Sequence, residues 1–156
     1  MDEYTDATFH ETVVPLSRRQ AFHLFTELFA DWWPKEYTWS QSALKTIGIE
    51  PKEGGRCTEE GPYGFQVDWG RVVVWEPPER LVLAWQIGPN RVPQPNPEHA
   101  STVEVRFSAE GPEATRLTIE HRDFRRHGEG AAEYRDGMAS DWGWPFILER
   151  FRQSSY

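Results

Sequence analysis

The residue best suited to chemistry in this chain is a histidine near the end of a predicted strand. His121 follows Leu117 and Ile119 at alternate positions of the segment Thr115 to His121, and alternate residues of a strand share one face of the sheet. We therefore expect His121 to point toward the core, where an imidazole can transfer a proton, orient a ligand or simply form hydrogen bonds. The sequence places no carboxylate beside it, which favours the purely structural role.

Other reactive side chains form no recognisable catalytic or metal-binding pattern. His121, Asp123 and His127 could be drawn as metal ligands, but their spacing matches no compact motif, so no metal site is predicted. Cys57, the single cysteine, has no histidine tied to it and is interpreted as a small buried hydrophobe. There is no nucleophile elbow, phosphate loop or dinucleotide fingerprint. No cofactor is predicted, and a non-enzymatic role is favoured over an enzymatic one.

Aromatic side chains dominate the apolar part of the composition. Eight Trp, nine Phe and five Tyr make up 14% of a chain of 156 residues that is only 38% hydrophobic. Such rings fill cores, and they also pack well around cavities. The length predicts a single domain over residues 1–156, which is enough to bury roughly 70% of the surface of the unfolded chain.

The charge excludes several classes of partner. A formal net charge of −8 repels phosphates and anionic lipid headgroups, so we expect neither nucleic acid nor a membrane as partner. The densest basic cluster is interleaved with acids and is interpreted as a solvated loop: Arg122, Arg125, Arg126 and His127. An acidic N-terminus, one cysteine and the lack of an apolar run of about 18 residues predict a cytoplasmic location.

The hydrophobic periodicity predicts a strand, a helix, a run of strands and a final helix. Ser17 and Gln20 form a capping-box pattern ahead of a helix that should continue until Pro34. In the C-terminal region Trp144, Ile147, Leu148 and Phe151 have helical spacing. Strands are predicted at 7–14, 37–50, 56–59, 65–75, 81–85, 101–107 and 115–121, and a shorter helix at 131–138.

The hairpin from Gly70 to Trp85 turns at Pro77 and Pro78, which cannot donate to a strand ladder. If Val72 and Val74 face inward, strict alternation places Trp69 and Trp75 on the outer face. This element order is typical of an α+β fold, an antiparallel sheet with helices on one side. A cavity is expected because one terminal helix cannot fill the concave face of a curved sheet.

Several segments resemble the proteins similar to the activator of heat shock protein 90 ATPase. That family belongs to the START-like, or SRPBCC, helix-grip superfamily, which includes polyketide cyclases and binders of lipids and plant hormones. The likeness extends from about Thr8 to Phe151. The motifs that carry it are Phe25-Thr-Glu, Trp32-Trp33-Pro34, Gly54-Gly55-Arg56, Asp68-Trp69-Gly70-Arg71-Val72, Trp75-Glu-Pro-Pro-Glu-Arg-Leu and Trp142-Gly-Trp144.

The resemblance implies a helix-grip fold of the START-like or Bet v 1-like kind, in which a curved antiparallel β-sheet wraps around a long C-terminal α-helix. It also implies an elongated, mostly apolar pocket between sheet and helix. By position, the predicted pocket residues are Trp39, Val72, Leu83, Trp85, His121, Trp144, Ile147 and Leu148. The family supplies no set of catalytic residues to carry over.

Three functional hypotheses follow. The leading one is a binding module for a small hydrophobic or aromatic ligand. The second is a cyclase- or hydratase-type enzyme with His121 as acid or base and Asp68 or Arg122 polarising a carbonyl; it rests on fold analogy. The third is a protein-interaction domain like the chaperone regulators, which requires exposed Trp pairs. A homodimer through an outer face bearing Trp69 and Trp75 is a milder version of the third.

Overall fold

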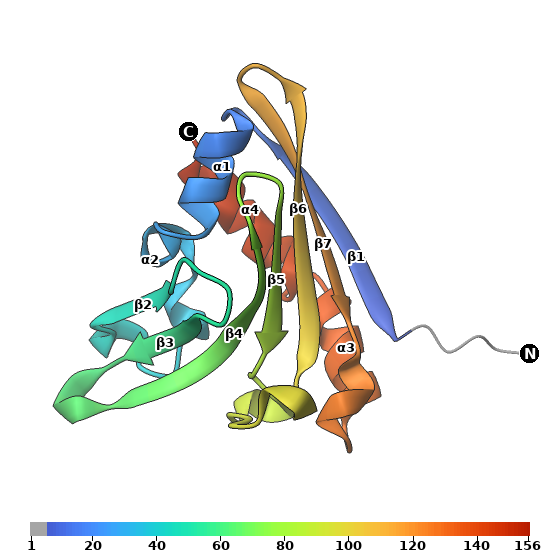
Figure 1. Ribbon diagram of the computed structural model, residues 1–156. Helices are drawn as coiled ribbons and strands as arrows, with labels where there is room; N and C mark the ends of the chain where they lie inside the picture. Colours follow the sequence, from blue (N-terminus) through green and yellow to red (C-terminus); the bar gives the residue numbers. More distant parts are fainter. Residues whose placement is uncertain (1–5) are drawn as a thin grey trace, which may run out of the picture.

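A curved antiparallel sheet with helices packed on one face makes up the computed structural model, which describes residues 6–156 (Figure 1). Seven strands pair in the order β1-β7-β6-β5-β4-β3-β2. The acidic segment before Asp6 lies outside the described residues. The strands are β1 (Ala7–Val14), β2 (Thr46–Ile49), β3 (Arg56–Glu60), β4 (Gln66–Glu76), β5 (Arg80–Trp85), β6 (Ser101–Gly111) and β7 (Ala114–Arg122).

Four α-helices accompany the sheet: α1 (Arg18–Phe25), α2 (Phe29–Trp32), α3 (Ala131–Ala139) and α4 (Trp144–Ser154). The predicted capping box is confirmed, because Ser17 Oγ accepts from the Gln20 amide at 3.2 Å and Gln20 Oε1 accepts from the Ser17 amide at 3.0 Å. The helix predicted to reach Pro34 ends instead at Phe25. The Thr26 amide and hydroxyl both donate to the Phe22 carbonyl, at 3.0 and 2.7 Å, and the Leu28 amide then bonds to the His23 carbonyl, five residues back, so the regular helical pattern is lost.

The C-terminal helical segment is broken at Gly143, between α3 and α4. A side chain at this position would bring its Cβ to 2.2 Å from the Met138 carbonyl oxygen, so the close approach of the two helices requires glycine. Helix α4 runs behind the sheet in Figure 1 and buries its apolar stripe against it. That stripe consists of Trp144, Ile147, Leu148 and Phe151. The α+β helix-grip architecture predicted from the sequence is confirmed.

The strand predicted over 37–50 is wrong for most of its length, since only Thr46–Ile49 is extended. Short 3-10 turns precede it, and the cause is the fully buried carboxylate of Glu59. Its two oxygens accept from the backbone amides of Trp39 at 3.1 Å and Ser40 at 2.8 Å. These amides therefore need no strand partner.

The predicted facing of β4 is also wrong. Trp69 is only 1% exposed, and Trp75 packs on the core with its ring 5.1 Å from that of Phe22. The register of β4 shifts once against β3 and once against β5, between Val72 and Val74. Each bulge adds a residue and reverses the alternation, so both Trp69 and Trp75 turn inward while Val72 stays inside. A homodimer built on these two indoles loses its interface, and dimerisation by another face stays a prediction.

No helix among residues 6–156 is long and apolar enough to cross a membrane.

Candidate functional site

A chain of buried polar side chains surrounds His121 on the inner face of β7. Trp144 Nε1 lies 3.0 Å from His121 Nδ1, and His121 Nε2 lies 2.7 Å from Ser101 Oγ. Ser101 Oγ in turn lies 2.8 Å from His127 Nε2. An indole can only donate, so His121 Nδ1 accepts, its Nε2 carries the proton and donates to Ser101, and Ser101 donates to His127. The Trp144 indole therefore determines which group donates in each hydrogen bond of this series.

These hydrogen bonds and the burial of the ring keep His121 neutral and engage both of its ring nitrogens. The side chain is fully buried, and burial, followed by the nearby His127 and His10, holds its pKa well below the ordinary value. Both ring nitrogens already have partners, and the ring packs with its centroid 4.0 Å from that of Phe124. The structural role expected for His121 therefore describes its contacts better than an acid–base role does.

The helpers proposed for His121 in an enzyme have other partners. Arg56 binds the two oxygens of Asp68 at 3.1 and 3.0 Å. Arg122 follows His121 in the strand and so points to the opposite face, where it donates to Glu104 at 2.8 Å and to Glu120 at 2.7 Å. Neither charge faces the imidazole.

Two further expectations concern Cys57 and metals. Cys57 is fully buried, as expected, and burial raises the pKa of its thiol, which leaves it protonated. Within the part of the chain that the structure describes, no group of three or more His, Cys, Asp or Glu side chains is arranged to hold a metal ion.

A cavity of about 220 Å³ lies next to this polar chain. It is bounded by the end of β5, the 3-10 turn Pro89–Arg91 and the junction of α3 and α4. Its volume is slightly below the range typical of sites for drug-sized molecules, so it suits a compact ligand. Aromatic side chains form much of its wall: Trp33, Tyr37, Trp85, Tyr134 and Trp142.

Hydrogen bonds within the protein engage the polar ends of three of these rings. The Tyr134 hydroxyl accepts from Trp85 Nε1 at 2.9 Å and donates to the Ile87 carbonyl at 2.6 Å. The Tyr37 hydroxyl donates to the Trp142 carbonyl at 2.6 Å. Burial raises the pKa of Tyr134, so its hydroxyl keeps its proton. The cavity is therefore bounded mainly by ring surfaces whose orientations are fixed.

The predicted pocket residues divide into three groups. Trp85 and Ile147 line the cavity. Trp39 lies beside it, half-buried, and its Nε1 donates to the Arg91 carbonyl at 2.8 Å. The others are buried in the core near the sheet and α4: Val72, Leu83, His121, Trp144 and Leu148. Their part in ligand binding stays a prediction.

Sequence reasoning missed most of the remaining lining. Trp33 and Trp142 belong to motifs that carry the family resemblance, Trp32-Trp33-Pro34 and Trp142-Gly-Trp144, so a signal for them existed. Tyr134 lies in a helix that was predicted only as short. Arg91 lies in a proline-rich loop without periodicity, and only the folded chain brings it to the cavity.

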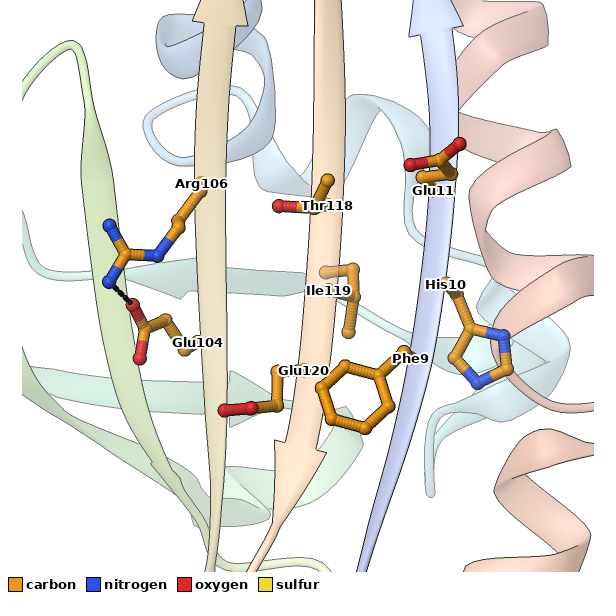
Figure 2. A pocket seen from close by; sticks show the side chains of 8 residues that line it. All are labelled: Phe9, His10, Glu11, Glu104, Arg106, Thr118, Ile119 and Glu120. Carbon is orange, nitrogen blue, oxygen red and sulfur yellow. Dashed lines mark ion pairs between the residues drawn. The ribbon is translucent and has the colours of Figure 1, made fainter.

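A second hollow, of about 510 Å³, lies across the outer face of β1, β7 and β6 (Figure 2). Its charged side chains all take part in ion pairs: Arg106 with Glu104 at 2.6 Å, and Glu11 and Glu120 with the nearby Arg116 and Arg122. Phe9, with 66% of its surface exposed, contributes one ring rather than a wall. The lining of this hollow is more polar than that of the 220 Å³ cavity, which we therefore take as the candidate site.

The Trp pairs expected by the interaction hypothesis are not exposed. Trp32 and Trp33 are 2% and 6% exposed. Trp142, 74% exposed, lines the mouth of the cavity. It is the one tryptophan among residues 6–156 that belongs to the exposed large hydrophobic side chains.

A curved antiparallel sheet, a broken C-terminal helix packed on it and a small aromatic cavity near their junction define a helix-grip protein of the START-like type. The family model described as activator of Hsp90 ATPase homolog 1-like protein matches residues 15–154, and the chain belongs to this family. The predicted family is thereby confirmed. A fold of this kind supports a ligand-binding module.

Two solved structures are similar to the chain over nearly its whole length. The anthrahydroquino-gamma-pyrone synthase Txn09, solved as a complex, is 31% identical, with 99% of each chain covered and a TM-score of 0.69. CalC from Micromonospora echinospora, a self-sacrificing resistance protein, is 30% identical, with 97% of this chain and 94% of CalC covered and a TM-score of 0.66.

Protein MLL2253 from Mesorhizobium loti, at 20% identity and a TM-score of 0.63, shares the fold, with 95% of each chain covered. Among curated proteins, no significant match was found.

Proposed function

We propose that this protein is a small-molecule binding module whose ligand is a compact hydrophobic or aromatic compound held in the 220 Å³ cavity. The observation that carries the proposal is the aromatic wall, with Trp85 and Tyr134 fixed by their mutual hydrogen bond at 2.9 Å. Rings fixed in this way can contact a flat ligand at little cost in side-chain entropy.

The similarity to Txn09 supports the same proposal. That protein is named as a synthase of an anthrahydroquino-gamma-pyrone and was solved as a complex. An identity of 31% over 99% of both chains makes a related, flat type of ligand reasonable here. We assign no catalytic residue, because His121 has both nitrogens engaged.

The remaining predicted residues take supporting roles in this proposal. Leu83 and Leu148 are core residues that back the wall, and Trp144 holds the His121 chain in place. Val72 lies opposite Leu83 in the β4–β5 ladder. Trp39 braces the turn that closes one side of the cavity through its bond to the Arg91 carbonyl.

The experiment fills the cavity and leaves the fold intact. Gly137 lines the cavity, and a Cβ added there meets nothing within 4 Å. The Gly137→Phe variant should occupy the space, while Gly137→Ala adds a single methyl group and serves as the matched control. Binding of 2-naphthol, a neutral two-ring probe, is measured by isothermal titration calorimetry and by thermal shift.

The wild type and Gly137→Ala should bind 2-naphthol, and a concentration near 100 Kd should stabilise each by about 2.7 kcal/mol. Gly137→Phe should keep the far- and near-UV circular dichroism of the wild type and lose binding. Equal binding by Gly137→Phe and the wild type would place the probe elsewhere and overturn the proposal. Failure of the wild type to bind 2-naphthol or any other flat two-ring probe would do the same.

A further inference from the structure

We propose that the ligand is an anion, a flat aromatic carboxylate or phenolate, and that Arg91 binds its charged group. The inference rests on the proposed function, since it concerns the same cavity. Arg91 is the single charged side chain among the described residues that line the cavity, in a protein whose net charge is −8. The molecule as a whole repels anions, whereas the wall of this cavity presents one cation.

The guanidinium of Arg91 has no carboxylate within 4.0 Å in the described part of the chain, unlike most arginines here. Its one hydrogen bond within residues 6–156 is a long one, from Nη2 to the Glu36 carbonyl at 3.3 Å. The neighbouring carboxylate of Glu36 is taken by Arg150 at 2.8 Å. A guanidinium has five N–H donors in a planar fork, so most of them remain for a ligand.

The backbone holds Arg91 in an uncommon conformation. Asn90 and Arg91 have φ values of 58° and 60°, two successive non-glycine residues in the left-handed region. Each such residue costs roughly 1–2 kcal/mol and persists only where surrounding contacts impose it. Here Trp39 Nε1 binds the Arg91 carbonyl at 2.8 Å, and the guanidinium carbon lies 5.4 Å from the centre of the Tyr37 ring. The turn thus presents Arg91 at the edge of an aromatic wall.

The surroundings strengthen the attraction that this cation exerts. The lining contains no carboxylate and is largely aromatic, and a charge beside apolar rings is screened less than a charge in water. Arg91 lies close enough to oppose the burial that raises the pKa of Tyr37 and of Tyr134. Its field therefore reaches both tyrosines of the wall. A carboxylate or phenolate on a ligand that contacts these rings could accept two parallel N–H bonds from the guanidinium.

The alternative is that Arg91 only braces the loop by stacking on Tyr37. A brace would support binding of neutral and anionic ligands equally, whereas a charge partner distinguishes them. The test therefore compares 2-naphthoate with 2-naphthamide, which has nearly the same shape and no charge. Dissociation constants are measured by isothermal titration calorimetry for the wild type, Arg91→Gln and Arg91→Lys. Arg152→Gln, which removes a cation paired with Glu149 on α4, is the matched control.

The wild type and Arg152→Gln should bind 2-naphthoate about 10- to 100-fold more tightly than 2-naphthamide, the range expected for a charged hydrogen bond. Arg91→Gln should reduce this preference to about 2-fold or less and leave 2-naphthamide binding unchanged, and Arg91→Lys should keep part of it. Equal wild-type affinities, an equal loss for both probes in Arg91→Gln, or the same change in Arg152→Gln would overturn the inference. Binding of 2-naphthamide alone would leave the proposed function standing, whereas binding of neither probe nor of 2-naphthol would remove both.

Discussion

Two aromatic regions of the interior have similar composition and opposite outcomes. In the first, Phe29 stacks on Trp69 with ring centres 4.8 Å apart, and Trp32 meets Phe151 at 5.0 Å. These four side chains are at most 2% exposed, and none of them lines the 220 Å³ cavity or the outer hollow. In the second, the rings around Trp85 enclose a cavity of about 220 Å³. We call these regions the closed cluster and the open cluster.

The difference lies in the polar atoms. In the closed cluster the Trp69 indole N–H is buried with no hydrogen-bond partner among residues 6–156, and the Trp32 indole makes one long bond, to the Phe25 carbonyl at 3.4 Å, so apolar contact dominates the packing. In the open cluster Trp85, Tyr134 and Tyr37 all have hydrogen-bonded polar ends. Directional bonds fix where a ring sits, while non-directional burial draws rings together until no space remains. A cavity can persist where directional hydrogen bonds outweigh the tendency of apolar rings to pack together.

The largest expected effect comes from removing a ring of the closed cluster. Trp69→Ala should lower the free energy of unfolding by about 3–5 kcal/mol, because the surrounding rings cannot collapse fully into the space. Trp142→Ala, an exposed ring of the open cluster, should change it by less than about 0.5 kcal/mol. Urea denaturation followed by circular dichroism measures both values. Similar losses in the two variants would contradict the division into closed and open clusters.

Removing a single hydroxyl tests the open cluster more narrowly. Tyr134→Phe leaves both the Trp85 indole N–H and the Ile87 carbonyl without their partner, so stability should fall by about 1–3 kcal/mol. Tyr37→Phe provides the counterpart, since it also removes a single hydroxyl, but its partner, the Trp142 carbonyl, is exposed and can bond to water, so the loss should be smaller. Urea unfolding of the two variants decides, and a smaller loss in Tyr134→Phe than in Tyr37→Phe would contradict the role given to buried hydrogen bonds.

The polar chain beside the open cluster predicts a pH dependence. The pKa of His121 is lowered on folding, so below about pH 6.5 the unfolded chain binds a proton that the folded chain does not. Stability should therefore fall as the pH decreases below that value, by up to about 1.4 kcal/mol per pH unit. His10 and His127, whose pKa values burial also lowers, add to the same slope.

Urea unfolding at about pH 7.5, 6.5 and 5.5 measures this slope. His121→Leu should be less stable at every pH, because the Trp144 indole loses its acceptor, and its slope should be smaller than that of the wild type. The same slope in both proteins would show that His121 contributes nothing to it.

The smallest effect should be a gain in stability. Gly137→Ala in α3 adds a methyl group with open space around it and should raise the free energy of unfolding by about 0.5–1 kcal/mol through helix propensity. Thermal unfolding measures the shift. Gly143→Ala is the contrasting variant, and it should lose stability because its Cβ would overlap the Met138 carbonyl oxygen. A gain in both variants would contradict the close approach at the helix break.

Local sequence signals predicted the bounds of the strands better than they predicted which face of the sheet each side chain occupies. The bounds of β1 match the prediction of 7–14, and those of β5 and β7 agree with 81–85 and 115–121 to within one residue at each end. Turn residues and alternation determine where such strands begin and end. The facing of Trp69 and Trp75 could not be predicted this way, because the bulges in β4 depend on its pairing with β3 and β5.

The sequence by itself determined the α+β class, the family and the inward direction of His121, because hydrophobic periodicity and short motifs are local properties of a chain. Only the tertiary structure decided which rings pack solidly and which enclose a cavity. It also decided that Arg91, from a loop without periodicity, meets Tyr37 at the cavity mouth and that the buried Glu59 replaces a predicted strand. These features arise from contacts between residues far apart in the chain, which depend on register, bulges and hydrogen-bond partners that a single segment does not encode.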